Sequence, residues 1–201
     1  MVRLPGTELQ LKAEQIPQEE VFEALVPVFA ISGGGLSLSQ LCELSGLQGT
    51  TVQNWVKRGW VEPPQNKKYG PRQVARVLLI NLLRPTMQLE QIAQLLTCIN
   101  GRLDDRSDDM LSDEQLYSLV ARLVLRLEHT EGMDAQAISR LVKETLREQD
   151  DLPAPAREKL ASALEATLLN ICAAHMMQRA RELYTHIGIL PPVAARNTHT
   201  A

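Results

Sequence analysis

The chain has 201 residues, of which 44% are hydrophobic and 22% are charged, a composition typical of an ordinary globular protein with one domain or two small ones. No stretch approaches the ~20 apolar residues that span a bilayer, and the N-terminus lacks the apolar run of a secretory signal, so we expect a cytoplasmic protein. Its three cysteines, Cys42, Cys98 and Cys172, form neither a metal-ligand spacing nor an even disulfide set, which favours a reducing compartment.

The chain is predicted to be all-α, because its apolar residues recur every three or four positions and hardly ever alternate. We expect residues 1–16 to form a flexible N-terminus. Pro17 then opens a short helix, which the three glycines at residues 33–35 bring to an end.

Two short helices are predicted next, separated by a turn of a few residues. Ser37 or Ser39 is expected to cap the first, and Gly46 ends it, since glycine adopts the left-handed conformation of a helix end without penalty. Thr50 or Thr51 is expected to cap the second. Its inner face consists of Val52, Trp55 and Val56. Two helices joined in this way are typical of a helix-turn-helix, in which the second helix enters the major groove.

The formal net charge of -3 is unevenly distributed along the chain. Residues 51–84 contain seven cations against Glu62 alone and so carry +6, which leaves -9 for the rest. The cations are Lys57, Arg58, Lys67, Lys68, Arg72, Arg76 and Arg84. Such an asymmetry indicates a surface for an anionic partner, although a charge run can also be only a solvated face.

The same segment supplies residue types that contact nucleic acid. Gln53, Asn54, Lys57 and Arg58 lie off the apolar face of the second short helix, and amides and cations read base edges or bind phosphates. Trp60 is compatible either with the core or with stacking on a base.

The order of two short helices, a basic segment and two further helices resembles the DNA-binding domain of MerR-type regulators. The matching residues are Leu38, Leu41-Cys42, Gly46, Thr51-Val52, Trp55, Gly59, Lys67-x-Tyr69 and the run from Gln88 to Ile92. The chain departs from that family at Gln53 and Asn54, where arginine and tyrosine are common. Over Phe22 to Val124 it resembles an uncharacterised bacterial family, a domain of unknown function with a MerR-like core. The resemblance implies a winged helix-turn-helix domain over residues 17–101.

Residues 102–187 are predicted to form a C-terminal helical domain, a candidate region for dimerisation or for binding an unknown effector. Ser112 and Asp134 each have the features of a helix start, and the longest helix runs from about Ala156 to His186. It carries an apolar stripe of Leu164, Leu168, Cys172, Met176, Ala180, Leu183 and Ile187, which would pack on the preceding helices or across a dimer interface. Residues 188–201 are expected to form a flexible tail.

Metal binding and catalysis find little support in the sequence. The acidic segment Asp104 to Asp109 lacks the glycine and closing glutamate of a calcium loop, and Cys172 with His175 has no third ligand nearby. No phosphate-binding glycine loop or catalytic serine or zinc motif is present. We therefore expect no enzyme activity, no cofactor and no metal.

The sequence thus predicts a sequence-specific DNA-binding transcriptional regulator, active as a homodimer because one recognition helix reads too few base pairs. The alternative is a non-enzymatic protein-interaction module that keeps a MerR-like fold and does not bind DNA. The predicted contacts to double-stranded DNA are Thr50, Thr51, Gln53, Asn54, Lys57, Arg58, Lys67, Lys68, Tyr69 and Arg72.

Overall fold

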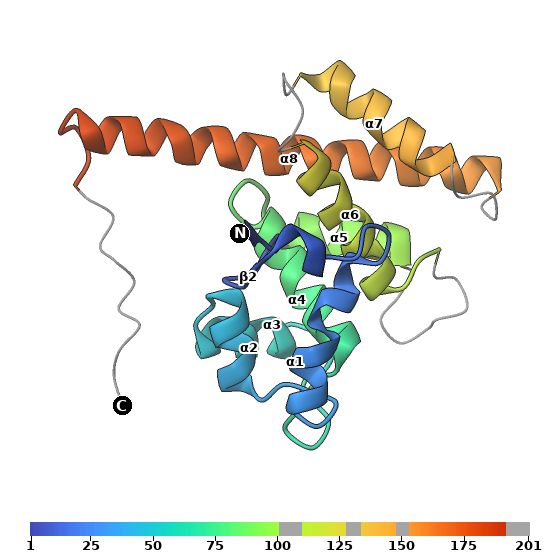
Figure 1. The fold of residues 1–201 in the computed structure, drawn as a ribbon, viewed down its shortest axis with the longest axis vertical. Helices are drawn as coiled ribbons and strands as arrows, with labels where there is room; N and C mark the ends of the chain where they lie inside the picture. Colours follow the sequence, from blue (N-terminus) through green and yellow to red (C-terminus); the bar gives the residue numbers. More distant parts are fainter. Residues whose placement is uncertain (101–109, 128–133, 148–152, 192–201) are drawn as a thin grey trace.

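The computed structural model describes residues 1–100, 110–127, 134–147 and 153–191, and within these ranges the protein is mostly helical, as predicted (Figure 1). The acidic segment at residues 104–109 and most of the predicted tail lie outside the described residues. The elements are β1 (Val2–Arg3), β2 (Gln10–Leu11), the 3-10 helices η1 (Ala13–Gln15) and η2 (Val21–Leu25), and the α-helices α1 (Val26–Ile31), α2 (Leu38–Ser45), α3 (Gly49–Lys57), α4 (Pro71–Leu83), α5 (Leu89–Asn100), α6 (Asp113–Leu127), α7 (Ala135–Arg147) and α8 (Ala154–His186).

The first sixteen residues are packed against the helices, contrary to the expectation of a flexible N-terminus. Strands β1 and β2 pair in antiparallel fashion, and Leu4 between them is fully buried. The hydroxyl group of Tyr117 donates a hydrogen bond to the carbonyl oxygen of Pro5 at 2.7 Å, and the amide of Asn81 donates to that of Gly6 at 3.0 Å. Tyr117 lies 112 residues from Pro5 and Asn81 lies 75 residues from Gly6, so no local pattern in residues 1–16 could reveal these hydrogen bonds.

Helices α2 and α3 form a compact pair joined by a short turn. Ser37 caps α2 as predicted, since its hydroxyl oxygen accepts from the backbone N–H of Gln40 at 3.3 Å. Gly46 ends α2 in the left-handed conformation, with φ of 69°. The prediction that a threonine caps α3 was wrong. Gln48 occupies the N-cap position without a side-chain hydrogen bond, which leaves Thr50 and Thr51 inside the first helical turn.

The hydrophobic core continues across the predicted domain boundary at residue 101. Helix α6 packs against α4, η2 and α8, so it completes the N-terminal core and does not start a separate one. The rings of Phe22 and Tyr117 meet edge to face with centroids 5.7 Å apart, and the backbone N–H of Phe22 donates to Ser118 at 3.0 Å.

Helix α8 is divided into a buried and an exposed half. Leu160, Leu164, Leu168 and Cys172 are buried against the other helices, and Figure 1 shows α7 beside this half, while the half ending at His186 extends past the body. Of the described helices, α8 alone is long and apolar enough to cross a membrane by length and composition, a test that a buried core helix also passes.

Candidate nucleic-acid interface

Helix α3 presents one apolar and one polar face. Val52 and Trp55 are buried in the core and hold the helix against α2, whereas the side chains on the opposite side face solvent. The exposed residues are Thr50, Gln53, Asn54 and Lys57, with Thr51 half-buried at the edge. A nine-residue helix therefore offers two side-chain amides, a hydroxyl and an ammonium group on a single surface. These groups can pair with base edges and phosphates.

Arg58 follows the last residue of α3 and is held by two neighbours. Its Nη1 lies 3.4 Å from the Oε1 atom of Glu90 on α5, and its guanidinium carbon lies 5.2 Å from the centroid of the Trp60 ring. Trp60 is half-buried and packs against the core, and its ring makes a cation–π contact with the Arg58 guanidinium group. A shallow groove runs between α3 and the start of α5, with Asn54 and Arg58 on one side and Glu90 on the other.

A tight turn follows α3 and carries two lysines. Gln65 and Lys68 exchange backbone hydrogen bonds of 2.9 and 2.8 Å, and both intervening residues, Asn66 and Lys67, have positive φ angles of 50° and 63°. This is the geometry of a two-residue hairpin turn. The side chains of Lys67 and Lys68 are exposed, and the Lys68 Nζ atom also donates to the carbonyl oxygen of Ser32 at 2.6 Å.

Two residues predicted to contact DNA are not available on the surface. Tyr69 is only 3% exposed, pairs through its backbone with Leu36, and its burial raises the pKa of its hydroxyl group. Arg72 lies in α4, where its side chain is 16% exposed and forms ion pairs with Asp113 at 3.3 Å and Glu62 at 3.9 Å. Asp113 is 41 residues further along the chain, so the pairing could not be predicted from local spacing.

The positive charge of residues 51–84 is therefore reduced at the surface. Arg76, like Arg72, is turned inward, and its Nη1 atom lies 2.9 Å from the Oδ1 atom of buried Asp113. The exposed cations of the segment are Lys57, Arg58, Lys67, Lys68 and Arg84. The structure thus separates a surface group of cations from an interior pair that connects α4 to α6.

Among the described residues, no group of three or more histidine, cysteine, aspartate or glutamate side chains could hold a metal ion. Cys172 is buried while His175, one turn later, is exposed. Burial raises the pKa of the thiols of Cys42 and Cys172, so both favour the protonated form.

The fold and this surface define a mostly helical domain that presents a short polar helix and a turn with two lysines. The chain belongs to the family described as "Domain of unknown function (DUF1836)", which matches residues 13–120. The match extends from η1 into α6 and includes α3, the turn and the Arg76–Asp113 pair. It confirms the predicted membership of an uncharacterised domain family.

The chain is also similar to the uncharacterized protein YkrK of Bacillus subtilis (strain 168). The two are 29% identical over 162 residues, which is 76% of this chain and 70% of that protein. No solved structure matches the chain.

Proposed function

We propose that the protein is a sequence-specific DNA-binding transcriptional regulator of the winged helix-turn-helix type, acting without enzymatic activity in the cytoplasm. The observation that carries the proposal is the exposed polar face of α3, with Gln53, Asn54 and Lys57 projecting from a helix whose other face is anchored by Val52 and Trp55. In this proposal α3 is the recognition helix and α2 lies across the DNA backbone.

The polar residues have different roles in the proposed complex. The amides of Gln53 and Asn54 can each pair with the N6 and N7 edge of adenine, which is worth ~1–3 kcal/mol of discrimination against a wrong base. Lys67 and Lys68 act as the wing and bind phosphates, which adds affinity without sequence information. Thr50 and Lys57 lie beside the amides and contact the backbone at the groove edge.

The proposed active form is a homodimer joined through the exposed half of α8. Apolar side chains recur there with alternating steps of four and three residues, the repeat of a two-helix seam. The seam consists of Leu169, Ala173, Met176, Ala180, Leu183 and Ile187. Leu183 and Ile187 are 50% and 63% exposed in the single chain, and pairing with a second copy would bury them.

The test is fluorescence anisotropy with the full-length protein. Labelled duplexes of mixed sequence measured over a salt series should show affinity that falls as salt rises, and selection from a random pool should yield a preferred duplex. Alanine at Gln53 or Asn54 should lower the preference for the selected duplex over the random pool about tenfold, with the salt dependence unchanged. Gln178→Ala, on the exposed half of α8, is the matched amide control and should leave both unchanged.

The alternative, a protein-interaction module that does not bind DNA, is favoured by the inward placement of Tyr69 and Arg72, which removes two of the ten predicted DNA contacts. The same experiment separates the two functions. Absence of salt-dependent affinity for every duplex would exclude DNA binding and leave α3 and the exposed half of α8 as protein-binding surfaces.

A further inference from the structure

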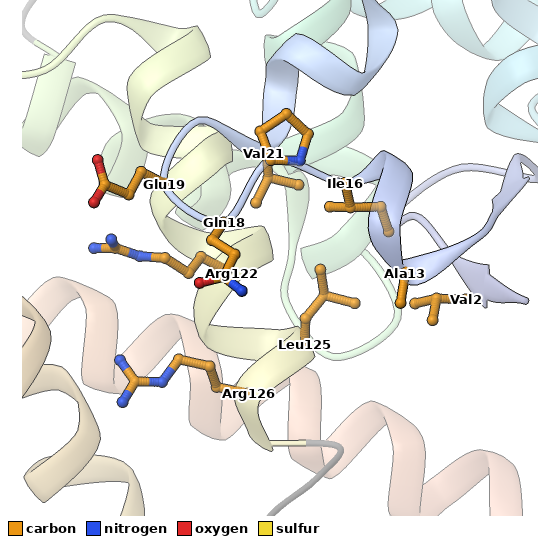
Figure 2. A pocket seen from close by; sticks show the side chains of 10 residues that line it. Val2, Ala13, Ile16, Gln18, Glu19, Val21, Arg122, Leu125 and Arg126 are labelled. Carbon is orange, nitrogen blue, oxygen red and sulfur yellow. The ribbon is translucent and has the colours of Figure 1, made fainter.

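A pocket lies between the N-terminal segment and the C-terminal half of α6, away from α3 (Figure 2). Its volume is about 570 Å³, within the range of small-molecule sites. One wall comes from β1, η1 and the connection to η2, and the other from α6. The pocket therefore exists only because the first sixteen residues are folded back onto α6, which the sequence did not predict.

The pocket has an apolar and a charged end. Val2, Ala13, Ile16, Val21 and Leu125 supply aliphatic side chains, and in Figure 2 they lie together on one side. Burying an aliphatic group of a ligand against them is worth ~0.8 kcal/mol for each CH₂ group.

The charged end is formed by Arg122 and Arg126 of α6, with Gln18 and Glu19 from the opposite wall. The two arginines are four residues apart, hence on one face of the helix, and Figure 2 shows both side chains extending to the same side, away from Val2. The Nη1 atom of Arg126 also lies 3.4 Å from the hydroxyl oxygen of Thr145 on α7. Figure 2 shows the side chains of Glu19 and Arg122 at the same end of the pocket.

We propose that this pocket binds a small amphiphilic carboxylate, with its anionic group at Arg122 and Arg126 and its apolar body against Ile16, Val21 and Leu125. A guanidinium group matches a carboxylate with two parallel hydrogen bonds. A carboxylate brings a single negative charge to the two guanidinium groups, and the negative charge of Glu19 on the opposite wall disfavours the dianion of a phosphate ester.

Because Glu19 lines the same end of the pocket as Arg122, its negative charge would oppose an anionic ligand there. The proposal therefore makes opposite predictions for the two walls: loss of the Arg122 charge weakens binding, whereas loss of the Glu19 charge strengthens it. A pocket that merely collects apolar molecules would respond to neither change.

The experiment uses the full-length protein without DNA, so its outcome is independent of the proposed DNA binding. Sodium octanoate is the probe, titrated by isothermal calorimetry and by thermal unfolding, with acetate, 1-octanol and hexyl phosphate as comparison ligands. Octanoate should bind with one site per chain and raise the melting temperature in a saturable way. Acetate lacks the apolar body and 1-octanol lacks the charge, so both should bind at least tenfold more weakly.

Four variants complete the test. Arg122→Gln should weaken octanoate binding about tenfold or more, and Glu19→Gln should strengthen it about threefold. Arg140→Gln, which removes an exposed arginine of α7, is the control and should bind as the native protein does. Arg122→Lys keeps the charge but loses the two parallel N–H donors of the guanidinium group. It replaces Arg122→Gln in the test if circular dichroism shows that Arg122→Gln is unfolded. The proposal is overturned if octanoate binds the native protein no better than 1-octanol does, or if hexyl phosphate binds it more tightly than octanoate. It is also overturned if octanoate binds the Arg122 variants as tightly as it binds the native protein.

Discussion

The Nη1 atom of Arg76 lies 2.9 Å from the Oδ1 atom of Asp113, and the two side chains are 3% and 1% exposed. The Nε atom of Arg72 lies 3.3 Å from the other carboxylate oxygen, so one aspartate at the start of α6 holds two cations of α4. Arg76 also donates from its Nε to the carbonyl oxygen of Trp60 at 3.4 Å. The cluster joins the segment after α3 to the C-terminal helices through buried charge.

We predict that Asp113→Asn destabilises the protein by ~3–5 kcal/mol, because it removes the carboxylate that compensates the charge of the buried Arg76 guanidinium group. Urea unfolding followed by circular dichroism measures the loss. Glu182→Gln breaks an exposed ion pair with Arg179 and should cost less than about 1 kcal/mol. An Asp113→Asn variant as stable as the Glu182 control would show that the cluster contributes nothing.

The buried Tyr117 predicts a pH-dependent stability. Burial raises the pKa of its hydroxyl group above the ordinary value of 10.0. Above about pH 10 the unfolded chain therefore loses a proton that the folded chain retains, and the free energy of unfolding falls by ~1.4 kcal/mol per pH unit from this group. Below pH 10 the contribution is constant.

Tyr117→Phe isolates the effect. At pH 8 the variant should be ~1–3 kcal/mol less stable than the native protein, because the carbonyl oxygen of Pro5 loses its donor. By pH 11 the difference should shrink by about 1.4 kcal/mol, since phenylalanine has no proton to lose. Tyr184→Phe, which removes an exposed hydroxyl group, is the control for the loss of a tyrosine hydroxyl outside the core. A Tyr117→Phe difference that does not change with pH would contradict the prediction.

The ion pairs of Asp113 and the hydrogen bond of Tyr117 also show what the sequence could and could not predict. The cap at Ser37, the end of α2 at Gly46 and the buried face of α3 depend on residues within four positions of each other, and the local pattern was sufficient for them. Asp113 and Tyr117 act on partners 37 and 112 residues away, and nothing in their own neighbourhoods indicates this. The same limitation explains why the sequence predicts Arg72 as a DNA contact and residues 1–16 as a flexible N-terminus.

In the proposed complex with DNA, the ion pair between Arg58 and Glu90 predicts that α5 restrains binding. Both side chains are 62% exposed, and the Glu90 carboxylate occupies a position where it competes with a phosphate for Arg58. Glu90→Gln should therefore raise affinity for mixed duplexes about two- to threefold at low salt. Glu182→Gln makes the same change of charge on α8 and should raise it less. If both substitutions raise the affinity equally, the increase comes from the change in net charge and not from the release of Arg58.

A substitution of the exposed Lys67, at the tip of the turn, tests whether this turn contacts DNA phosphates as a wing. Lys67→Gln should weaken binding to all duplexes to a similar degree and reduce the slope of log K against log salt by about one unit, as loss of a single phosphate contact does. Lys143→Gln removes an exposed lysine from α7 and is the control. A variant at Lys67 with unchanged slope, while the native protein binds DNA, would place the turn away from the duplex.

The exposed half of α8 predicts self-association, and point substitutions test this better than a shortened chain. A protein ending near Gly101 would lack α6, and the face of α4 that α6 covers would become exposed, so its association state would reveal little about α8. Met176 and Leu183 are 55% and 50% exposed and lie one seam repeat apart on the solvent-facing part of the helix. Charges at these positions leave the core intact.

Sedimentation equilibrium at micromolar concentration should show the native chain as a dimer and the Met176→Glu, Leu183→Glu double variant as a monomer, because pairing would bury two carboxylates in an apolar seam. His175→Glu introduces a carboxylate outside the seam and should remain dimeric. The native chain would in addition unfold at a temperature that rises with protein concentration, whereas the double variant would not. A native chain that sediments as a monomer would contradict self-association, and then the apolar half of α8 would require a different partner.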